Sequence, residues 1–365
     1  MRILVAGGGI LGCSAALALA QAGHAVTLRT QGHLGEGASS KAAGIVSTMT
    51  WNDDDLRLIA RTRGLVGEMV GLAMSEGCRE ARGAWRKAES IMVSGQADAG
   101  VLDAVQERLE RHTEEPERLS ALEAARQFPM LRFAPGEEVL VAQEDGVLES
   151  GDLFAALRAR LDAEGVAVEE RQPVAVPREG LPAGVEALVV AGGAWTVPLL
   201  RTAGVLLPAL PYRVQLASVG LAAGGETPIV HDLVHHFYAR PESPRTILAG
   251  DGTELRPFDP SDYNEAGDGW FVERLAASLV ERFVEGGDAT VRSSWAGLVV
   301  GTPDRRPLCG PVPGRDGLFV LTGDNGFGLM RGLALGERLA DAVAGRTHPA
   351  TDPARFGWPP PTDFP

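Results

Sequence analysis

The sequence is poor in lysine, in cysteine and in long apolar runs. Lys41 and Lys87 are the two lysines among 365 residues, so arginine carries most of the positive charge. The three cysteines, Cys13, Cys78 and Cys309, form no CxxC pair, which argues against a zinc site and a disulfide framework. Unpaired thiols suit a reducing cytosol, so we expect a cytoplasmic protein. No run of about 18 apolar residues appears, and residue 2 already starts a strand, so we expect neither a transmembrane segment nor a signal peptide.

The overall charge limits the partners. The formal net charge is -14, and the isoelectric point is near 5.0. Such acidity argues against nucleic acid or an anionic membrane as the main partner. Hydrophobic residues make up 45% of the chain, which indicates a globular protein, and the length favours two interleaved domains.

The first thirty residues have the pattern of a strand, a helix and a second strand. Residues 2–6 predict a buried parallel strand, residues 11–22 an alanine-rich helix, and residues 25–28 a second strand. Gly23 stands where a glycine often ends a helix. This is a complete βαβ start.

Three glycines lie in the turn of this unit with the spacing GxGxxG. Gly7 permits the tight turn, Gly9 lets a pyrophosphate approach the backbone, and Gly12 lets the helix pack close to the strand. The N-terminus of the helix would then face the phosphates with free N–H groups. The sequence therefore predicts a dinucleotide site.

One position departs from that pattern. An acidic residue usually ends the second strand and binds the ribose of the adenosine, whereas this chain has Arg29, Thr30 and Gln31 there. Thr30 can form one hydrogen bond to the ribose. Arg29 leaves NADP open as an alternative cofactor, because an arginine here can accommodate a 2′-phosphate.

Further α/β segments appear in the middle and near the end of the chain, with β-rich segments between them. We therefore expect an α/β and α+β fold in which a discontinuous Rossmann-like domain holds an inserted, mixed and mainly antiparallel sheet. The predicted helices cover residues 54–76, 99–112, 121–126, 152–164, 270–284 and 329–344. The predicted strands cover residues 166–169, 187–191, 214–219, 235–239, 246–250, 293–300 and 318–321, and we expect loops at 32–48 and 301–316.

Six segments, in this order along the chain, resemble the D-amino-acid oxidase superfamily of FAD-dependent oxidoreductases, which includes glycine oxidase, sarcosine oxidase and amino-acid dehydrogenases. The resemblance runs from residue 2 to about residue 356. The segments are residues 5–12, residues 37–44, residues 145–147 leading into the helix at 152, residues 189–195, residues 238–241 with 250–254, and residues 295–298 with 302–304 and 323–332.

The resemblance implies noncovalent FAD and a division of the chain into two domains. The FAD domain would comprise residues 1–80, 145–210 and 290–346, the substrate domain residues 81–144 and 211–289, and residues 347–365 an irregular tail. The family's loop at 38–44 would wrap the pyrophosphate and the flavin edge, and the helix from Leu329 would point its N-terminus at the flavin C2 carbonyl. The implied cofactor residues are Gly7, Gly9, Ile10, Leu11, Gly12, Thr30, Ser39, Ser40, Lys41, Ala42, Ala43, Gly44, Val174, Ala191, Gly192, Trp195, Gly323, Asn325, Gly326, Phe327, Gly328, Leu329 and Met330.

The reaction implied by the resemblance is oxidation of the C–N bond of an amino acid or secondary amine to an imine. It needs a neutral substrate amine with its Cα–H aimed at flavin N5. Tyr238 matches an active-site tyrosine of glycine oxidase, and His236 and Arg240 would share its strand face. We expect these three residues to contact the substrate, and we expect His231 and His235 on the surface.

Another position departs from the resemblance. Relatives carry an arginine that clamps the substrate carboxylate where this chain has Val299. Arg213, Arg240 or Arg331 takes that role, or the substrate has no carboxylate. An alternative function is an accessory flavoprotein subunit that binds FAD but needs a partner for turnover. Oxygen or another electron acceptor, and the oligomeric state, stay open.

Overall fold

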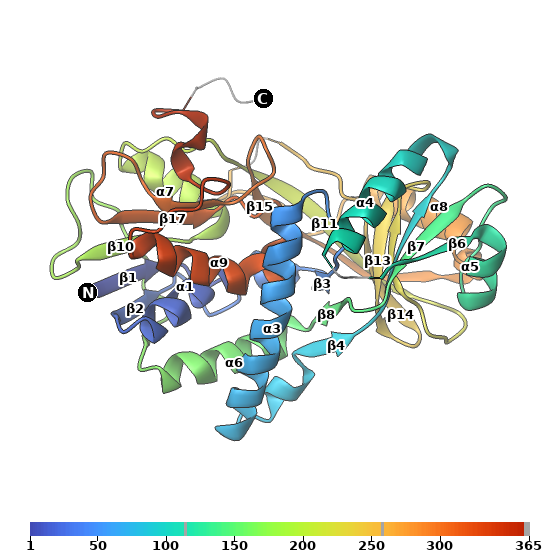
Figure 1. Ribbon diagram of the computed structural model, residues 1–365, viewed down its shortest axis with the longest axis horizontal. Coiled ribbons are helices and arrows are strands. Elements are labelled where there is room, and N and C mark those ends of the chain that lie inside the picture. Colours follow the sequence, from blue (N-terminus) through green and yellow to red (C-terminus); the bar gives the residue numbers. More distant parts are fainter. Residues whose placement is uncertain (113–114, 257–258, 361–365) are drawn as a thin grey trace.

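Two large sheets organise the protein. The computed structural model describes residues 1–112, 115–256 and 259–360. In Figure 1, a six-stranded sheet with α1 (Ile10–Gln21) and α9 (Gly328–Val343) lies on the left, and an eight-stranded sheet lies on the right. The long helix α3 (Asp53–Ser75) stands between them.

The six-stranded sheet is parallel except at one edge. Its order is β16-β17-β10-β1-β2-β9, and the antiparallel pair is β16 with β17. The strands are β1 (Arg2–Ala6), β2 (Ala25–Arg29), β9 (Ala167–Glu169), β10 (Ala187–Val190), β16 (Leu308–Pro311) and β17 (Leu318–Thr322). The prediction of a loop over residues 301–316 is wrong at β16, because this short strand forms only by pairing with β17 and has no strong pattern of its own.

Apolar residues on alternate positions of β1 bury both faces of this sheet. Ile3 and Val5 face a core shared with α1, α3, α9 and α6 (Ser150–Ala163). Leu4 and Ala6 face a second core that contains α7 (Thr196–Thr202). The helix α3 begins at Asn52, whose side chain accepts the N–H of Asp55, and three aspartates occupy its first turn.

The eight-stranded sheet is mainly antiparallel, in the order β15-β11-β14-β13-β12-β5-β7-β6, with β12 parallel to β5. Two helices, α8 (Gly269–Arg282) and α5 (Ala121–Gln127), cover one face. The helix α4 (Ala99–Arg111) packs at one end of the other face. The strands are β5 (Ser90–Ser94), β6 (Glu117–Ser120), β7 (Glu138–Ala142), β11 (Leu210–Gly220), β12 (Ile229–Asp232), β13 (Phe237–Ser243), β14 (Thr246–Gly250) and β15 (Thr290–Gly301).

A small three-stranded sheet joins the two large ones. Its order is β3 (Ile45–Val46), β8 (Gly146–Leu148) and β4 (Trp85–Lys87). The predicted loop before β3 contains a single helical turn, α2 (Ala38–Lys41). The expected mixed α/β class is confirmed.

The domain boundaries stay a prediction. The strand β15 pairs with β11 in the eight-stranded sheet, although we expected residues 290–346 on the cofactor side. In the predicted irregular tail, a 3₁₀ turn covers Pro353–Phe356, and residues 361–365 lie outside the described residues. In the described part of the chain, no helix has both the length and the apolar character to cross a membrane.

Candidate active site

The turn between β1 and α1 brings a helix N-terminus to the edge of the parallel sheet. Gly7 has a φ of 132°, a conformation that favours glycine, and a Cβ on it would lie 2.9 Å from the amide nitrogen of Gly192. A Cβ on Gly12 would overlap the carbonyl oxygen of Gly7. The predicted tight turn and the predicted close helix packing are therefore both present.

The N-terminus of α1 is left open on one side. Its N-cap, Gly9, has no side-chain cap, and the first turn contains no acidic residue. The hydroxyl of Ser39 accepts the N–H of Ile10 at 3.1 Å, and a Cβ on Gly9 would meet only this hydroxyl, at 3.4 Å. The open amides and the positive end of the helix dipole make this edge suitable for an anion.

The contacts of Arg29, at the end of β2, bear on the choice between NADP and FAD. The Nε of Arg29 lies 2.5 Å from the Glu169 carboxylate. Its charge is therefore matched within the protein, which weakens the NADP alternative. Thr30 is buried, and its side chain would lie 2.8 Å from a Cβ on Gly8. It packs against the glycine turn, beside the predicted ribose position.

Four other predicted cofactor residues lie near this turn or behind it. Ala191 donates its N–H to the carbonyl of Ala6 at 2.8 Å. Val174 and Trp195 pack against the apolar core on the second face of the parallel sheet. These residues and Gly192 are outside the lining of the cavity described below.

The loop before α9 has an unusual backbone that holds the start of the helix in place. Gly323, Asn325 and Gly326 have φ values of 75°, 52° and 85°. The Asn325 side chain accepts the N–H of Thr302 at 3.1 Å and donates to the Gly323 carbonyl at 2.6 Å. Its amide is thus used within the loop. The neighbouring Asp324 is half-buried, and the loss of solvent around its carboxyl group raises the pKa of that group.

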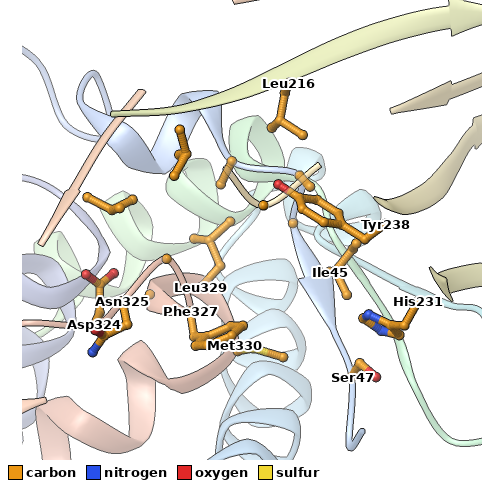
Figure 2. Close-up of a pocket in the computed structure, with 18 of the residues that line it drawn as sticks. Ile45, Ser47, Leu216, His231, Tyr238, Asp324, Asn325, Phe327, Leu329 and Met330 are labelled. Carbon is orange, nitrogen blue, oxygen red and sulfur yellow. The ribbon is translucent and has the colours of Figure 1, made fainter. Parts of the chain in front are cut away.

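A cavity of about 520 Å³ lies between these elements and the face of the eight-stranded sheet that α8 and α5 do not cover. Figure 2 shows Phe327, Leu329 and Met330 from α9 and its N-terminal end, with Tyr238 and His231 on the sheet side. The predicted cofactor residues that line it are Ile10, Ser39, Lys41, Ala42, Ala43, Gly44, Asn325, Gly326, Phe327, Gly328, Leu329 and Met330. Ser40, on α2, is outside the lining, and its hydroxyl donates to the Glu36 carbonyl at 3.1 Å.

Alternate residues of β11 and β15 form the sheet wall of the cavity, as expected for a two-residue period. The facing pairs are Tyr212 with Val299, Val214 with Gly297, and Leu216 with Trp295. The indole N–H of Trp295 donates to the Lys41 carbonyl at 2.9 Å, which ties this wall to α2.

Tyr238 lies on β13 directly opposite His231 on β12, and both line the cavity. The Tyr238 ring lies over Gly250, where a Cβ would be 2.6 Å from the phenolic oxygen. His231 is therefore wrongly predicted as a surface residue. Burial lowers the pKa of its imidazole to about 4, so the ring is neutral at pH 7. Its buried Nε2 has no hydrogen-bond partner in the described structure.

His236 lines the cavity but not as part of a strand. It has a φ of 54° and is exposed, and β13 begins at the next residue. The predicted placement of His236 on the strand face of Tyr238 is therefore wrong, because the chain turns at this residue.

Arg240 shares the strand face of Tyr238 but lies outside the cavity lining. Its guanidinium donates to the Glu149 carboxylate at 2.9 and 3.2 Å and to the Ala43 carbonyl at 2.8 Å. In place of an open substrate clamp, the structure has an internal ion pair. The role of Arg240 toward a substrate stays a prediction.

The comparisons with known proteins agree with this geometry. A family model described as FAD dependent oxidoreductase (DAO) matches residues 2–342. The chain belongs to this family. It is 31% identical to a glycine oxidase of Pseudomonas aeruginosa, over 97% of this chain and 98% of that protein.

Two solved structures have the same fold as this chain. The L-proline dehydrogenase from P. horikoshii has a TM-score of 0.87 at 19% identity, and the match covers 97% of each chain. The glycine oxidase from Geobacillus kaustophilus has a TM-score of 0.84 at 23% identity, and the match covers 100% of each chain. The family model and the relative of 31% identity confirm the predicted superfamily.

The residues present fit FAD. The open amides of α1 suit its pyrophosphate, and the cavity runs from Ile10 and Ser39 to the N-terminus of α9. No cluster of three or more histidine, cysteine or acidic residues suits a metal ion in the parts of the chain described. FAD is therefore the cofactor of this oxidoreductase, in agreement with its family.

Sequence reasoning missed several cavity residues, among them His231, Tyr212, Trp51 and Met92. His231 reaches the site because β12 pairs with β13 on one side and β5 on the other. The segment of β12 is only four residues long. The one signal for His231 was its place opposite Tyr238, the position of the family's active-site tyrosine. That signal requires the pairing of β12 with β13 to be known.

Proposed function

We propose that this flavoprotein oxidises the C–N bond of an amine or amino acid to an imine. When bound, FAD supplies the acceptor for a hydride equivalent. The observation that carries the proposal is the single cavity that joins the cofactor cradle of Ile10 and Ser39 to Tyr238 and His231. The names of the similar proteins, glycine oxidase and L-proline dehydrogenase, support the same bond type.

The chain's own groups would bind and orient the substrate nitrogen. Burial raises the pKa of the Tyr238 phenol, so it stays protonated and can donate a hydrogen bond. His231 is neutral and can accept one. Leu216, Val299 and Trp295 form a wall that limits water around the reacting carbon.

We further propose that FAD is bound noncovalently. Cys13 and Cys309 are buried, and burial raises the pKa of both thiols to about 12, which disfavours their reactive thiolate forms. Neither they nor Cys78 is among the cavity residues of the described chain. Heat or acid precipitation should leave the flavin in the supernatant. Flavin that stays with the precipitated protein would show a covalent bond.

Anaerobic bleaching tests the reaction itself. The purified protein is mixed without oxygen with glycine, sarcosine, proline, a panel of D-amino acids and simple amines, while the visible absorption band of oxidised flavin is followed. Loss of that band with at least one C–N compound is expected. If the flavin stays oxidised with every compound while dithionite bleaches it, the proposed function is wrong and the accessory-subunit alternative gains support.

A further inference from the structure

The cationic groups of the cavity are already paired with acids of the protein. The lining contains three basic side chains that are cationic at neutral pH, Lys41, Arg305 and Arg331. Each one faces a carboxylate: Lys41 with Glu265 at 3.2 Å, Arg305 with Glu254 at 3.5 Å, and Arg331 with Asp55. A substrate carboxylate that entered would have to compete with these internal partners.

The other two arginines considered for a carboxylate clamp are also occupied. Arg213 points to the face of β11 opposite Tyr212, where its Nη1 lies 2.8 Å from Asp268. Arg240 is held by Glu149. The family's clamp position is Val299, whose side chain lines the cavity. In the described chain, every arginine considered for this clamp forms an ion pair with an internal acid, and only the Nε of Arg331 is left without a hydrogen-bond partner among these three guanidinium groups' buried atoms.

Acidic groups outnumber basic groups around the cavity. The lining includes five carboxyl groups, Asp55, Asp232, Asp251, Glu254 and Asp324, against the three bases. Asp324 has no ion pair to a side chain within the described residues, whereas Asp232 pairs with Arg282 at 2.6 Å and Asp251 with Arg274. Four of the five carboxyl groups thus have an arginine partner, and each of the three lining bases has an acidic partner, so the ion pairs around the cavity leave no surplus cation for a substrate anion.

The inner wall offers neutral hydrogen-bonding groups in an apolar setting. His231 and Tyr238 form a cross-strand pair, and the Nε2 of His231 has no partner in the parts that the structure describes. Met49, Met92, Leu216 and Leu233 also line the cavity. A buried polar atom without a partner is costly, so a ligand that donates a hydrogen bond to Nε2 would gain from filling this position.

We propose that the substrate is an amine whose oxidised carbon carries no carboxylate, and that His231 and Tyr238 bind its nitrogen. This inference rests on the proposed C–N oxidation and narrows it. The imidazole accepts an N–H of the neutral amine, while the phenol donates to its lone pair. A carboxylate on the same carbon would lose its hydration without gaining a free cation.

Matched pairs of compounds test the inference through the rate of anaerobic flavin bleaching. Suitable pairs are methylamine with glycine, ethylamine with alanine, and benzylamine with phenylglycine, because in each pair only one member carries a carboxylate on the carbon to be oxidised. Both enantiomers of each chiral acid are used. The amine without a carboxylate should bleach the flavin about tenfold faster or more at equal concentration. Faster bleaching by the carboxylated members would overturn the inference and leave the proposed function standing. No bleaching by any member would overturn the inference, and the wider panel of C–N compounds described above then decides the proposed function.

Substitution at Val299 supplies a binding readout that does not depend on turnover. V299R adds a guanidinium on the cavity wall, and S293R adds the same charge at an exposed position of the same strand. Benzoate binding, followed by its perturbation of the flavin spectrum, should be about tenfold tighter in V299R and unchanged in S293R. If the unmodified protein already binds benzoate as tightly as V299R, an available cation exists and the inference is wrong.

Two substitutions separate the role of His231 from a general loss of structure. H231F should raise the amine concentration needed for half-maximal bleaching about tenfold, because the hydrogen bond is lost. H231Q should restore part of it, since its side-chain oxygen can accept. Benzoate binding should stay the same in both variants. An unchanged amine dependence in H231F would exclude His231 as the binding group.

Discussion

Gly9 lies where α1 begins and where a pyrophosphate would approach the backbone. Its φ of -77° suits any residue, and a Cβ would make only a 3.4 Å contact with Ser39. We expect G9A to fold normally and to bind FAD about tenfold or more weakly, because the methyl group would occupy the path of the phosphates. Flavin content after dialysis and the dissociation constant of FAD measure this.

A matched glycine outside the site serves as the control for G9A. Gly100 lies in α4, and a Cβ on it would meet nothing within 4 Å. G100A should retain FAD fully. Unchanged FAD affinity in G9A would mean that the cofactor does not pass this residue, and the anion role of the α1 N-terminus would be lost.

Asp145 illustrates the cost of a buried carboxyl group. It is fully buried, it accepts the N–H of Thr48 at 2.9 Å, and burial raises its pKa from 3.8 to about 6. Between these two values the unfolded chain is ionised and the native protein is not, so stability falls as pH rises. The cost is absent below pH 3.8 and complete above pH 6, where it amounts to about 3 kcal/mol.

We therefore expect D145N to gain stability relative to the unmodified protein by about 2 kcal/mol between about pH 4.5 and 7.5. Urea unfolding at the two pH values measures the gain. The neighbouring, exposed Glu144 provides a control of opposite sign, because Lys87 lowers the pKa of its carboxyl group. E144Q should lose stability slightly over the same range. A D145N effect independent of pH would show that Asp145 is ionised in the native protein throughout.

At the scale of elements, α1 and α9 approach each other through glycines. Gly328, Gly332 and Gly336 recur every four residues along one side of α9. A Cβ on Gly332 would lie 2.7 Å from Ile10, and a Cβ on Gly336 would overlap the backbone of Ser14. The close contact fixes the start of α1, which carries the glycine turn, against the helix at the cavity.

G336A should therefore destabilise the protein by about 1–3 kcal/mol and weaken FAD retention, although alanine favours a helix. The matched control is Gly71 on α3, which is exposed and has nothing within 4 Å of a Cβ. G71A should stabilise by about 0.5–1 kcal/mol. Thermal unfolding of both variants gives the comparison. Equal stabilisation by both would show that the two helices can separate without loss.

The sequence predicted best those helices and strands whose bounds depend on neighbouring residues. The elements of the βαβ start and α9 end within a residue or two of their predicted bounds, because glycine turns flank the two helices and largely apolar runs form the strands. The strands β5, β7 and β12 were missed, since their definition depends on pairing with distant segments. The same limit applies to side chains: the sequence does not show that Arg240 meets Glu149, 91 residues away.

At the scale of the whole molecule, Arg240 connects the eight-stranded sheet with segments on the cofactor side of the cavity. Arg240 extends from β13 of the antiparallel sheet to Glu149, before α6, and to the carbonyl of Ala43 in the cofactor loop. It therefore joins the substrate wall to the segment predicted to contact FAD. A substitution at Arg240 could therefore change the properties of the protein in two ways. It could remove a contact that connects the two parts of the structure, or it could remove a contact with the substrate.

A double-mutant cycle separates these two effects. R240M should lower the free energy of unfolding by about 2–3 kcal/mol. This is less than the loss of a fully buried ion pair would cost, because the Glu149 side chain is 35% exposed. The affinity for FAD should fall as well. E149Q should cost less, and R240M/E149Q should recover part of the loss, because no uncompensated charge remains. If R240M instead keeps its stability and FAD, and only the amine concentration for half-maximal bleaching rises, then Arg240 contacts the substrate. The ion pair would then open during binding, and the cavity would extend along β13 from Tyr238 to Arg240 in the working enzyme.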